Sequence, residues 1–285
     1  QTMDNYELIL VDDASTDNSA NIIDYYQRKN AEKISVYHFT KNEKQGKARN
    51  VGIRSAKGKY IIFLDSDDIL DSVACEALYR KAEEEAADIV FCDYELVGDK
   101  VKNEYCTHVD EEYLGDMTDE KRKALITTSV VPWAKMIKRK LIIDNAIFFP
   151  EGKSYEDRAT TYLYYLYANK VAKVEKPLYK YRIVENSTTN QRNMSRHFEA
   201  LEMGKLLIDR FKERCFETKY YQEIEYFAIE QLYCQGIINA KKQFDCFPKQ
   251  YADQLLEMLL LEFPNFEENK YFKRYMSEAY VMLVH

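Results

Sequence analysis

The stretch Tyr60–Leu70, YIIFLDSDDIL, joins five apolar residues to a cluster of three aspartates. A continuous apolar run of this length is typical of a strand buried on both faces of a sheet. Ligands of open α/β sheets bind beyond the carboxyl ends of the strands, which is where the aspartates stand. Asp oxygens suit Mg²⁺ or Mn²⁺, and closely packed carboxylates repel one another unless a cation or solvent compensates them. Asp65 and Asp67 therefore predict a binding site, although capping of the next helix by Asp67, Asp68 or Asp71 would explain the same residues.

Around this stretch, the first third of the chain alternates short apolar strands with helical segments. Strands are expected over 6–11, 34–39, 60–64 and 88–94, and helices over 15–29 and 72–87. Residues 46–57 are expected to be a loop that runs into a helix. Such alternation predicts an α/β fold with a mostly parallel mixed sheet and right-handed crossovers.

The rest of the chain changes character twice. Residues 97–125 lose the alternation and suggest an excursion such as a hairpin. Further on we expect a helix and then an edge within 130–150, a helix over 154–169 and a strand over 178–183. From residue 195 the pattern is helical, so the sequence predicts two domains, 1–194 and 195–285.

Composition and charge exclude several classes of protein. The 285 residues are 46% apolar and 31% charged, which is globular rather than disordered or collagenous. With 41 basic and 48 acidic residues, the net charge of −7 argues against a nucleic-acid-binding surface. Six scattered cysteines without C-x-x-C spacing favour a reducing compartment, so we expect a cytoplasmic protein. We expect no signal peptide and no membrane span.

A second acidic pair follows the first expected strand. Asp12 and Asp13 stand at its carboxyl end, just before a helix. Capping of that helix by Ser15, Thr16 or Asp17 is the simpler explanation for its polar start. However, two acidic strand ends in one sheet can converge on a single cleft, and this convergence favours a binding role for both.

Two further groups stand out. Arg49 lies in the window 46–58, which holds three of the chain's eight glycines but no P-loop motif. It could reach a phosphate or simply lie on a solvated helix face. Glu156 and Asp157 are adjacent carboxylates at an expected helix start, where they could supply a general base or only complement the helix dipole.

Taken in order, these motifs resemble the family 2 glycosyltransferases with a GT-A fold. The resemblance rests on QTxxNYELILVDDASTD, GKARNVGI, GKYIIFLDSDD, WAKMI and FPEGxxYEDR, and it extends through about residue 190. It implies an inverting enzyme of polysaccharide biosynthesis, a hexosyl- or N-acetylhexosaminyl-transferase. Such an enzyme moves a sugar from a nucleotide-sugar donor, often UDP-linked, to a hydroxyl of a glycan or cell-surface polymer. Most members use a divalent metal, here Mn²⁺ or Mg²⁺.

The resemblance also implies roles on the donor side. Asp12 and Asp13 would hold the uracil and the ribose, and Arg49 would help to hold the nucleotide. Asp65 and Asp67 form the family's D-x-D motif, in which Asp65 approaches the ribose side and Asp67 the metal that bridges the diphosphate.

On the acceptor side, the resemblance implies that Asp157 is the catalytic base. Glu156 and Trp133 would line the acceptor site. The segment that closes over the diphosphate would contain Arg182, Ser187 and Thr188. We expect Asp157 to lie in the first turn of the helix over 154–169, exposed to substrate, with its ionised form favoured by the helix N-terminus.

The chain departs from the family pattern in two places. Ala14 stands where the family usually has Gly, and the family's opening strand with its S-V-I-I-P-x-Y-N loop is absent. The second departure motivates an alternative, a non-catalytic nucleotide-sugar or glycan-binding module on a truncated transferase fold. A haloacid-dehalogenase phosphatase is a weaker rival, because the D-x-D-x-[TV] pattern is not met. The helical tail, with an aromatic-rich stretch over 220–233, could support self-association, and peripheral association with the inner membrane face is a further expectation.

Overall fold

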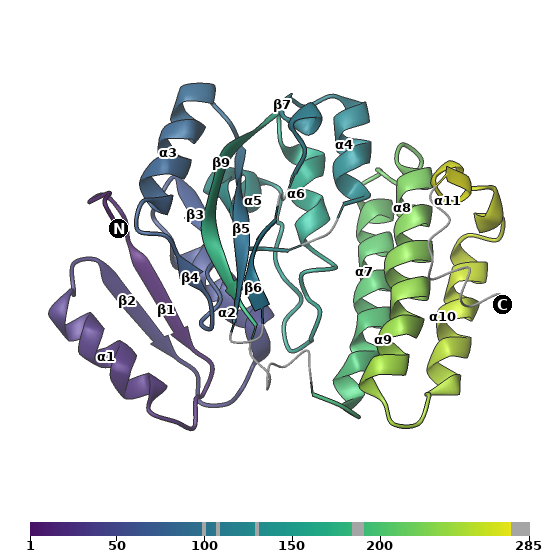
Figure 1. Ribbon diagram of the computed structural model, residues 1–285, viewed down its shortest axis with the longest axis horizontal. Helices are drawn as coiled ribbons and strands as arrows, with labels where there is room; N and C mark the ends of the chain where they lie inside the picture. The colour runs from purple at the N-terminus through teal and green to yellow at the C-terminus, as the bar shows by residue number, and fades with distance from the viewer. Residues whose placement is uncertain (99–100, 107–108, 129–130, 184–190, 275–285) are drawn as a thin grey trace. The chain divides into compact units, whose positions relative to one another are not determined.

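The protein is described by a computed structural model that covers residues 1–98, 101–106, 109–128, 131–183 and 191–274 (Figure 1). The chain divides into two compact units. The first contains residues 1–121 and 130–184, and the second contains residues 122–129 and 185–285. The domain boundary that the sequence suggests, after residue 194, stays a prediction.

The first unit contains two sheets. β1 (Leu8–Asp12) and β2 (Ile34–His38) form a parallel pair. The larger sheet has the order β3-β8-β5-β9-β4, with β6 on β5 and β7 on β9 (Figure 1). Its strands are β3 (Tyr60–Ile62), β4 (Ile69–Leu70), β5 (Ile89–Gly98), β6 (Val101–Cys106), β7 (Gly115–Asp116), β8 (Lys135–Lys138) and β9 (Lys170–Arg182).

The predicted α/β class and mixed sheet are confirmed, but the prediction of a mostly parallel sheet is wrong. β1 with β2 and β5 with β9 are parallel, while the other pairings of the described strands are antiparallel. The reason is that β8 enters between β3 and β5 and runs against both. The expected hairpin within 97–125 is confirmed by the antiparallel pair β5 and β6.

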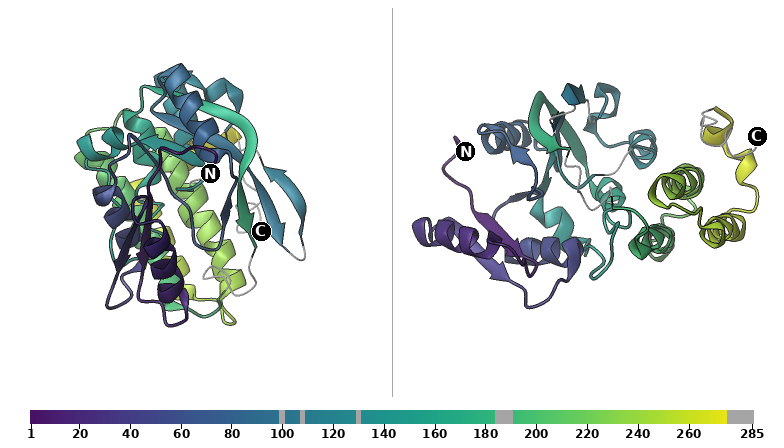
Figure 2. Two further views of the ribbon diagram at one scale, coloured as in Figure 1. Left: turned by 90° about the vertical axis from the view of Figure 1, so that its left-hand side faces the viewer. Right: turned by 60° about the horizontal axis from the view of Figure 1, so that its bottom comes forward.

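Helices cover the sheets and close the core of this unit (Figures 1 and 2). They are α1 (Ser19–Lys29), α2 (Lys44–Ser55), α3 (Ala74–Glu85), α5 (Arg139–Asp144) and α6 (Thr161–Tyr167), with a 3₁₀ turn at Glu111–Tyr113. α4 (Asp119–Ile126) begins in the first unit and ends in the second. α3 lays Leu78 and Ala82 on Val90 and Cys92 of β5, and all four side chains are fully buried.

One glycine fixes the position of α2. The sequence predicted a loop from residue 46, whereas α2 begins at Lys44 and holds Gly46 within its first turn. A Cβ atom on Gly46 would stand 2.0 Å from the carbonyl oxygen of Pro150. The absence of a side chain therefore allows α2 to lie directly against the segment that leads to Glu156.

The second unit is helical, as predicted. Its main helices, α7, α8–α9 and α10, run roughly parallel to one another (Figures 1 and 2). The elements are η3 (Ser195–Phe198), α7 (Glu199–Glu213), α8 (Tyr221–Phe227), a π-helical stretch η4 (Ala228–Cys234), α9 (Gln235–Gln243), α10 (Lys249–Glu262), η5 (Phe266–Glu268) and α11 (Lys270–Arg274). From the aromatic-rich stretch, Tyr220, Phe227 and Leu232 are buried inside the unit. Among the described residues, no helix is long and apolar enough to cross a membrane.

Candidate active site

The end of β1 holds the first acidic pair. Asp12 is 7% exposed, and one of its oxygens accepts the Ser15 N–H at 3.0 Å while the other lies 3.0 Å from Nδ1 of His38. The hydrogen bonds from Ser15 and from His38 hold the pKa of Asp12 below its ordinary value. Asp13 accepts the Glu43 N–H at 2.6 Å, which ties the end of β1 to the start of α2.

The residue after this pair, Ala14, is one of the two departures from the family pattern. Ala14 has φ = 59°, in the left-handed region. This conformation costs about 1 kcal/mol for alanine, whereas glycine adopts it freely. Ala14 thus adopts, with some strain, a conformation in which glycine would be unstrained.

The second acidic cluster follows β3 and is held by β9. The Asp65 N–H donates to the Tyr179 hydroxyl at 3.3 Å, and that hydroxyl donates to Asp68 at 2.5 Å. Asp68 also accepts the Arg182 N–H at 2.9 Å, and burial raises the pKa of its carboxyl group. Asp67 is exposed beside them. The N-cap residue of α3, Val73, makes no side-chain cap, and its N–H donates to Asp71 at 3.0 Å. The capping explanation therefore fits Asp71 but is wrong for Asp67 and Asp68.

Arg49 connects this cluster to a distant part of the chain. Its guanidinium donates to Asp65 at 2.9 Å and to Glu156, and it lies 5.4 Å from the centre of the Phe149 ring. The Arg49 side chain is only 11% exposed. Burial alone would lower the pKa of Arg49, but the carboxylates of Asp65 and Glu156 outweigh it and raise this pKa. Arg49 therefore stays charged and joins the end of β3 to the segment before α6.

The two carboxylates of that segment differ in their surroundings. Glu156 is 3% exposed and bound to Arg49, whereas Asp157 is half-buried and accepts the Arg158 N–H at 2.9 Å. Burial raises the pKa of both carboxyl groups, although Arg49 opposes it in each case. Asp157 is therefore the carboxylate of the pair that is not already committed to Arg49.

The helix predicted over 154–169 is shorter than expected. Residues 156–160 form turns, and α6 begins only at Thr161. Tyr155 adopts φ = 62°, which interrupts any helix at this point. Asp157 lies outside the helix, and burial raises its pKa, so the predicted stabilisation of its ionised form by a helix N-terminus is wrong.

The remaining predicted residues lie as follows. Trp133 is buried in the core, stacked on Tyr179 with ring centres 4.8 Å apart and on Tyr181 at 5.3 Å. Its 8% exposure offers an acceptor little surface, and its acceptor role stays a prediction. Arg182 is exposed and holds Asp68 through its backbone. Ser187 and Thr188 lie outside the described part of the chain.

The family model for "Glycosyl transferase family 2" matches residues 1–145. The chain belongs to this family. It is 33% identical over 193 residues to "Glycosyltransferase GlyG" of Streptococcus pneumoniae, covering 64% of this chain and 62% of that protein. It is 33% identical over 205 residues to "Putative glycosyltransferase EpsH" of Bacillus subtilis, covering 70% and 58%. The matched part thus spans less than two thirds of either relative. The predicted family is confirmed.

A solved structure shows the same fold. It is that of Staphylococcus aureus TarS 1–349 in complex with UDP-GlcNAc, with a TM-score of 0.63, 20% identity, and coverage of 95% of this chain and 83% of that one. The sequence of S. aureus TarS, a "Poly(ribitol-phosphate) beta-N-acetylglucosaminyltransferase", is 29% identical over 177 residues, which is 62% of this chain and 30% of that protein. The predicted GT-A-like fold is confirmed, and the phosphatase alternative is excluded by the family.

The candidate site of this family 2 glycosyltransferase offers few side-chain ligands to a metal ion. Among the described residues, no three His, Cys, Asp or Glu side chains are grouped to hold an ion by themselves. Asp67 is exposed beside Asp65, and its hard oxygens suit Mg²⁺ or Mn²⁺. Such ions commonly take one or two carboxylates and complete their shell with phosphate oxygens and water. The residues present therefore fit an ion that arrives with a diphosphate.

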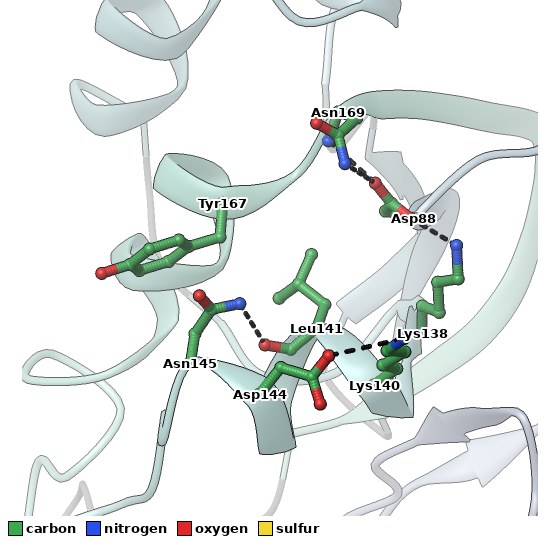
Figure 3. A pocket seen from close by; sticks show the side chains of 8 residues that line it. All are labelled: Asp88, Lys138, Lys140, Leu141, Asp144, Asn145, Tyr167 and Asn169. Carbon is green, nitrogen blue, oxygen red and sulfur yellow. Dashed lines mark hydrogen bonds and ion pairs between the residues drawn. The ribbon is translucent and has the colours of Figure 1, made fainter.

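A pocket of about 200 Å³ lies elsewhere in the same unit (Figure 3). Asp88 stands in it and accepts from Lys138 at 2.9 Å and from the backbone and side chain of Asn169. Lys138 pairs with Tyr60, the first residue of β3, whereas Asp65 lies beyond the C-terminal end of that strand. The pocket therefore lies at the opposite end of β3 from Asp65 and is separate from the candidate active site.

Sequence reasoning missed two functional neighbours. Asn50 is buried and binds the backbone of Phe149 in both directions, at 2.8 and 2.9 Å, and also the Glu151 carboxylate at 3.0 Å. It lies in the quoted GKARN motif, which is the signal that could have identified it. His38 contacts Asp12, and no motif marked it.

Proposed function

We propose that this chain transfers a sugar, with inversion, from a UDP-linked donor to a hydroxyl group of a cell-surface polymer, with Mn²⁺ or Mg²⁺ as cofactor. The observation that carries the proposal is the bridge from Asp65 through Arg49 to Glu156, next to Asp157. It brings the D-x-D aspartate and the two carboxylates of the candidate base segment to one place. The complex of TarS with UDP-GlcNAc and the poly(ribitol-phosphate) in that enzyme's name support the donor and acceptor classes.

The donor side is held at the ends of two strands. Asp12 and Asp13 would bind the uracil and ribose, and Asp67 would hold the metal. When bound, the metal would supply charge neutralisation at the leaving diphosphate, an effect of several kcal/mol. Because its guanidinium already binds two carboxylates, Arg49 acts by fixing Asp65 in place.

Asp157 serves as the base in this proposal. It takes the proton from the acceptor hydroxyl as that oxygen attacks the anomeric carbon from the face opposite the diphosphate, and a single displacement inverts the configuration. Burial raises the pKa of Asp157, and this makes its carboxylate a stronger base than an exposed aspartate. Association with the inner membrane face and self-association through the second unit stay predictions.

The first test replaces the metal-binding aspartate. Asp67→Asn should abolish the Mn²⁺ dependence of UDP binding, measured by calorimetry, because an amide is a poor metal ligand. The melting temperature should change by at most a few degrees, since Asp67 is exposed. Asp71→Asn, on the other side of the short strand β4, is the matched control and should bind UDP normally. Unchanged metal dependence in Asp67→Asn would contradict the assignment.

The second test replaces the base. Asp157→Asn should leave UDP binding near normal and reduce sugar transfer by roughly 10²–10⁴-fold, the usual contribution of a general base. Because Asp157 must be ionised, the wild-type rate should increase with pH until the raised pKa of this group is passed. Initial rates with a panel of UDP-sugars and wall polymers measure both effects. Wild-type turnover in Asp157→Asn would place the base elsewhere.

A further inference from the structure

His38, the last residue of β2, stands between two carboxylates. Its Nδ1 lies 3.0 Å from Oδ2 of Asp12 on β1, and its Nε2 lies 2.9 Å from Oδ1 of Asp24 on α1. The His38 and Asp24 side chains are 40% and 39% exposed, whereas that of Asp12 is 6% exposed. The imidazole therefore links a buried carboxylate of the candidate donor site to an exposed one on a neighbouring helix.

This geometry selects one protonation state. A neutral imidazole has one N–H donor and one acceptor nitrogen, so it can donate to only one carboxylate. The imidazolium donates to both. The hydrogen bonds to Asp12 and to Asp24 accordingly raise the pKa of His38 above its ordinary value.

The orientation of Asp12 depends on the same contact. One oxygen of Asp12 is held by the Ser15 N–H and the other by His38, so the two donors approach the carboxylate group from different parts of the chain. When His38 loses its proton, one of its ring nitrogens becomes an acceptor and can no longer donate to the carboxylate that it faces. One of the two hydrogen bonds, to Asp12 on β1 or to Asp24 on α1, is then lost. Asp12 also loses the positive charge beside it.

We propose that His38 is a positioning residue for the nucleotide: in its protonated form it fixes Asp12 in the orientation that the donor needs, so that UDP binds more weakly once His38 is neutral. This inference rests on the proposed role of Asp12 in the donor site. It assigns to a histidine outside the quoted motifs the control of donor affinity above about pH 6.5, the ordinary pKa of histidine.

Other charged groups lie around this contact. Asp17 is exposed and near enough to Asp12 to feel its charge, and carboxylates of this kind ionise well below pH 6. From α2, Lys47 lies 5.8 Å from the centre of the ring of Phe39, the residue after His38, and pairs with Glu43 at 3.5 Å. Within these described surroundings, His38 is the side chain of the type whose ordinary pKa lies nearest to neutral pH.

The test compares UDP binding of wild type and His38→Gln by calorimetry with Mn²⁺, from pH 5.5 to 9. Glutamine can still donate to Asp12 but cannot titrate. The ratio of the two dissociation constants cancels the ionisation of UDP itself. We expect His38→Gln to bind roughly two- to fivefold more weakly at pH 6, the scale of a half-exposed ion pair. The two proteins should bind equally at pH 9.

Asp24→Asn is the matched second variant. It keeps the contact between His38 and Asp12 but removes one of the two carboxylates that raise the pKa of His38. The midpoint of its pH profile should therefore move to lower pH than that of wild type. The His38 ring signal, identified among the four histidines by its loss in His38→Gln, should show the same shift in an NMR titration.

The outcomes are distinct. A dissociation-constant ratio that stays near one at every pH, or that does not vary with pH, overturns the inference, because a merely structural histidine would alter the melting temperature but not this profile. If His38→Gln fails to fold, equal midpoints in wild type and Asp24→Asn overturn it instead. A wild-type chain that binds no UDP at any pH refutes the proposed function and this inference together.

Discussion

Replacing Arg49 with Met tests how strongly the bridge between Asp65 and Glu156 stabilises the first unit. Methionine keeps most of the apolar stem and removes the charge. Glu156 is 3% exposed and would then be a buried carboxylate without its cation, while Asp65, with its side chain 30% exposed, can be solvated. Breaking a buried ion pair from one side costs about 3–5 kcal/mol of unfolding free energy. We expect Arg49→Met to lose this amount at pH 8.

The loss should depend on pH in a defined direction. Burial raises the pKa of Glu156 and Arg49 opposes it, so removal of Arg49 raises this pKa further. The folded variant then binds a proton that the unfolded chain has already released, and its stability falls as pH increases from about 4.5 to the new folded pKa. The deficit should be smaller at pH 5 than at pH 8, because protonation of Glu156 removes the unpaired buried charge.

Urea unfolding followed by Trp133 fluorescence measures the effect. This is the chain's single tryptophan, and it is buried in the core of the same unit, 4.8 Å from Tyr179 between ring centres. The double variant Arg49→Met with Glu156→Gln should recover part of the loss, because it buries no unpaired charge. A deficit below about 1 kcal/mol at pH 8, or one equal at pH 5 and 8, would refute the reasoning.

Two more predictions concern packing and burial in the same unit. Gly46→Ala should destabilise the protein by about 1–3 kcal/mol, because its Cβ would meet the Pro150 oxygen at 2.0 Å. Gly52→Ala in the same helix meets no atom within 4 Å and should stabilise by up to about 1 kcal/mol, so equal effects in urea unfolding would contradict the close approach. Burial lowers the pKa of Lys135 to about 7, so the wild-type free energy of unfolding should increase from pH 7 to 10, since the unfolded chain binds more protons there. In Lys135→Met the free energy of unfolding should increase less over this pH range. An equal dependence on pH in the variant and the wild type would contradict a buried neutral amine.

The sequence predicted those parts of the fold that local pattern determines. β1, β2, α3 and the start of β5 lie within a few residues of their predicted positions, because apolar runs and helical periodicity mark them. β8 was missed because Lys135–Lys138, KMIK, has a lysine at each end and no strand-like composition. It is a strand because β3 and β5 hydrogen-bond to it from both sides, and this pairing is a tertiary property.

The residues of the candidate site also divide into those that the local sequence predicts and those that only the tertiary structure brings together. Strand ends place Asp12 and Asp65 at carboxyl edges, and motif spacing was enough to identify them. The contact of Arg49 with Glu156 joins residues 107 positions apart, and nothing local to either residue specifies it. The sequence predicted a helix at Asp157 because the helical apolar spacing extends to residues before Thr161, where α6 begins. The positive φ of Tyr155, which ends this pattern, has no clear sequence signal.

The parallel pairing of β5 with β9 has a consequence for how the chain is made. Ile89 pairs with Val171 and Val97 pairs with Arg182, so β5 cannot acquire this neighbour until synthesis has passed residue 182. At about 5–20 residues per second, the apolar start of β5 waits several seconds on the ribosome with one edge uncovered. Non-local pairing of this kind also slows folding after release. We therefore expect the nascent first unit to be most vulnerable to aggregation, and most dependent on chaperones, between the emergence of β5 and that of β9.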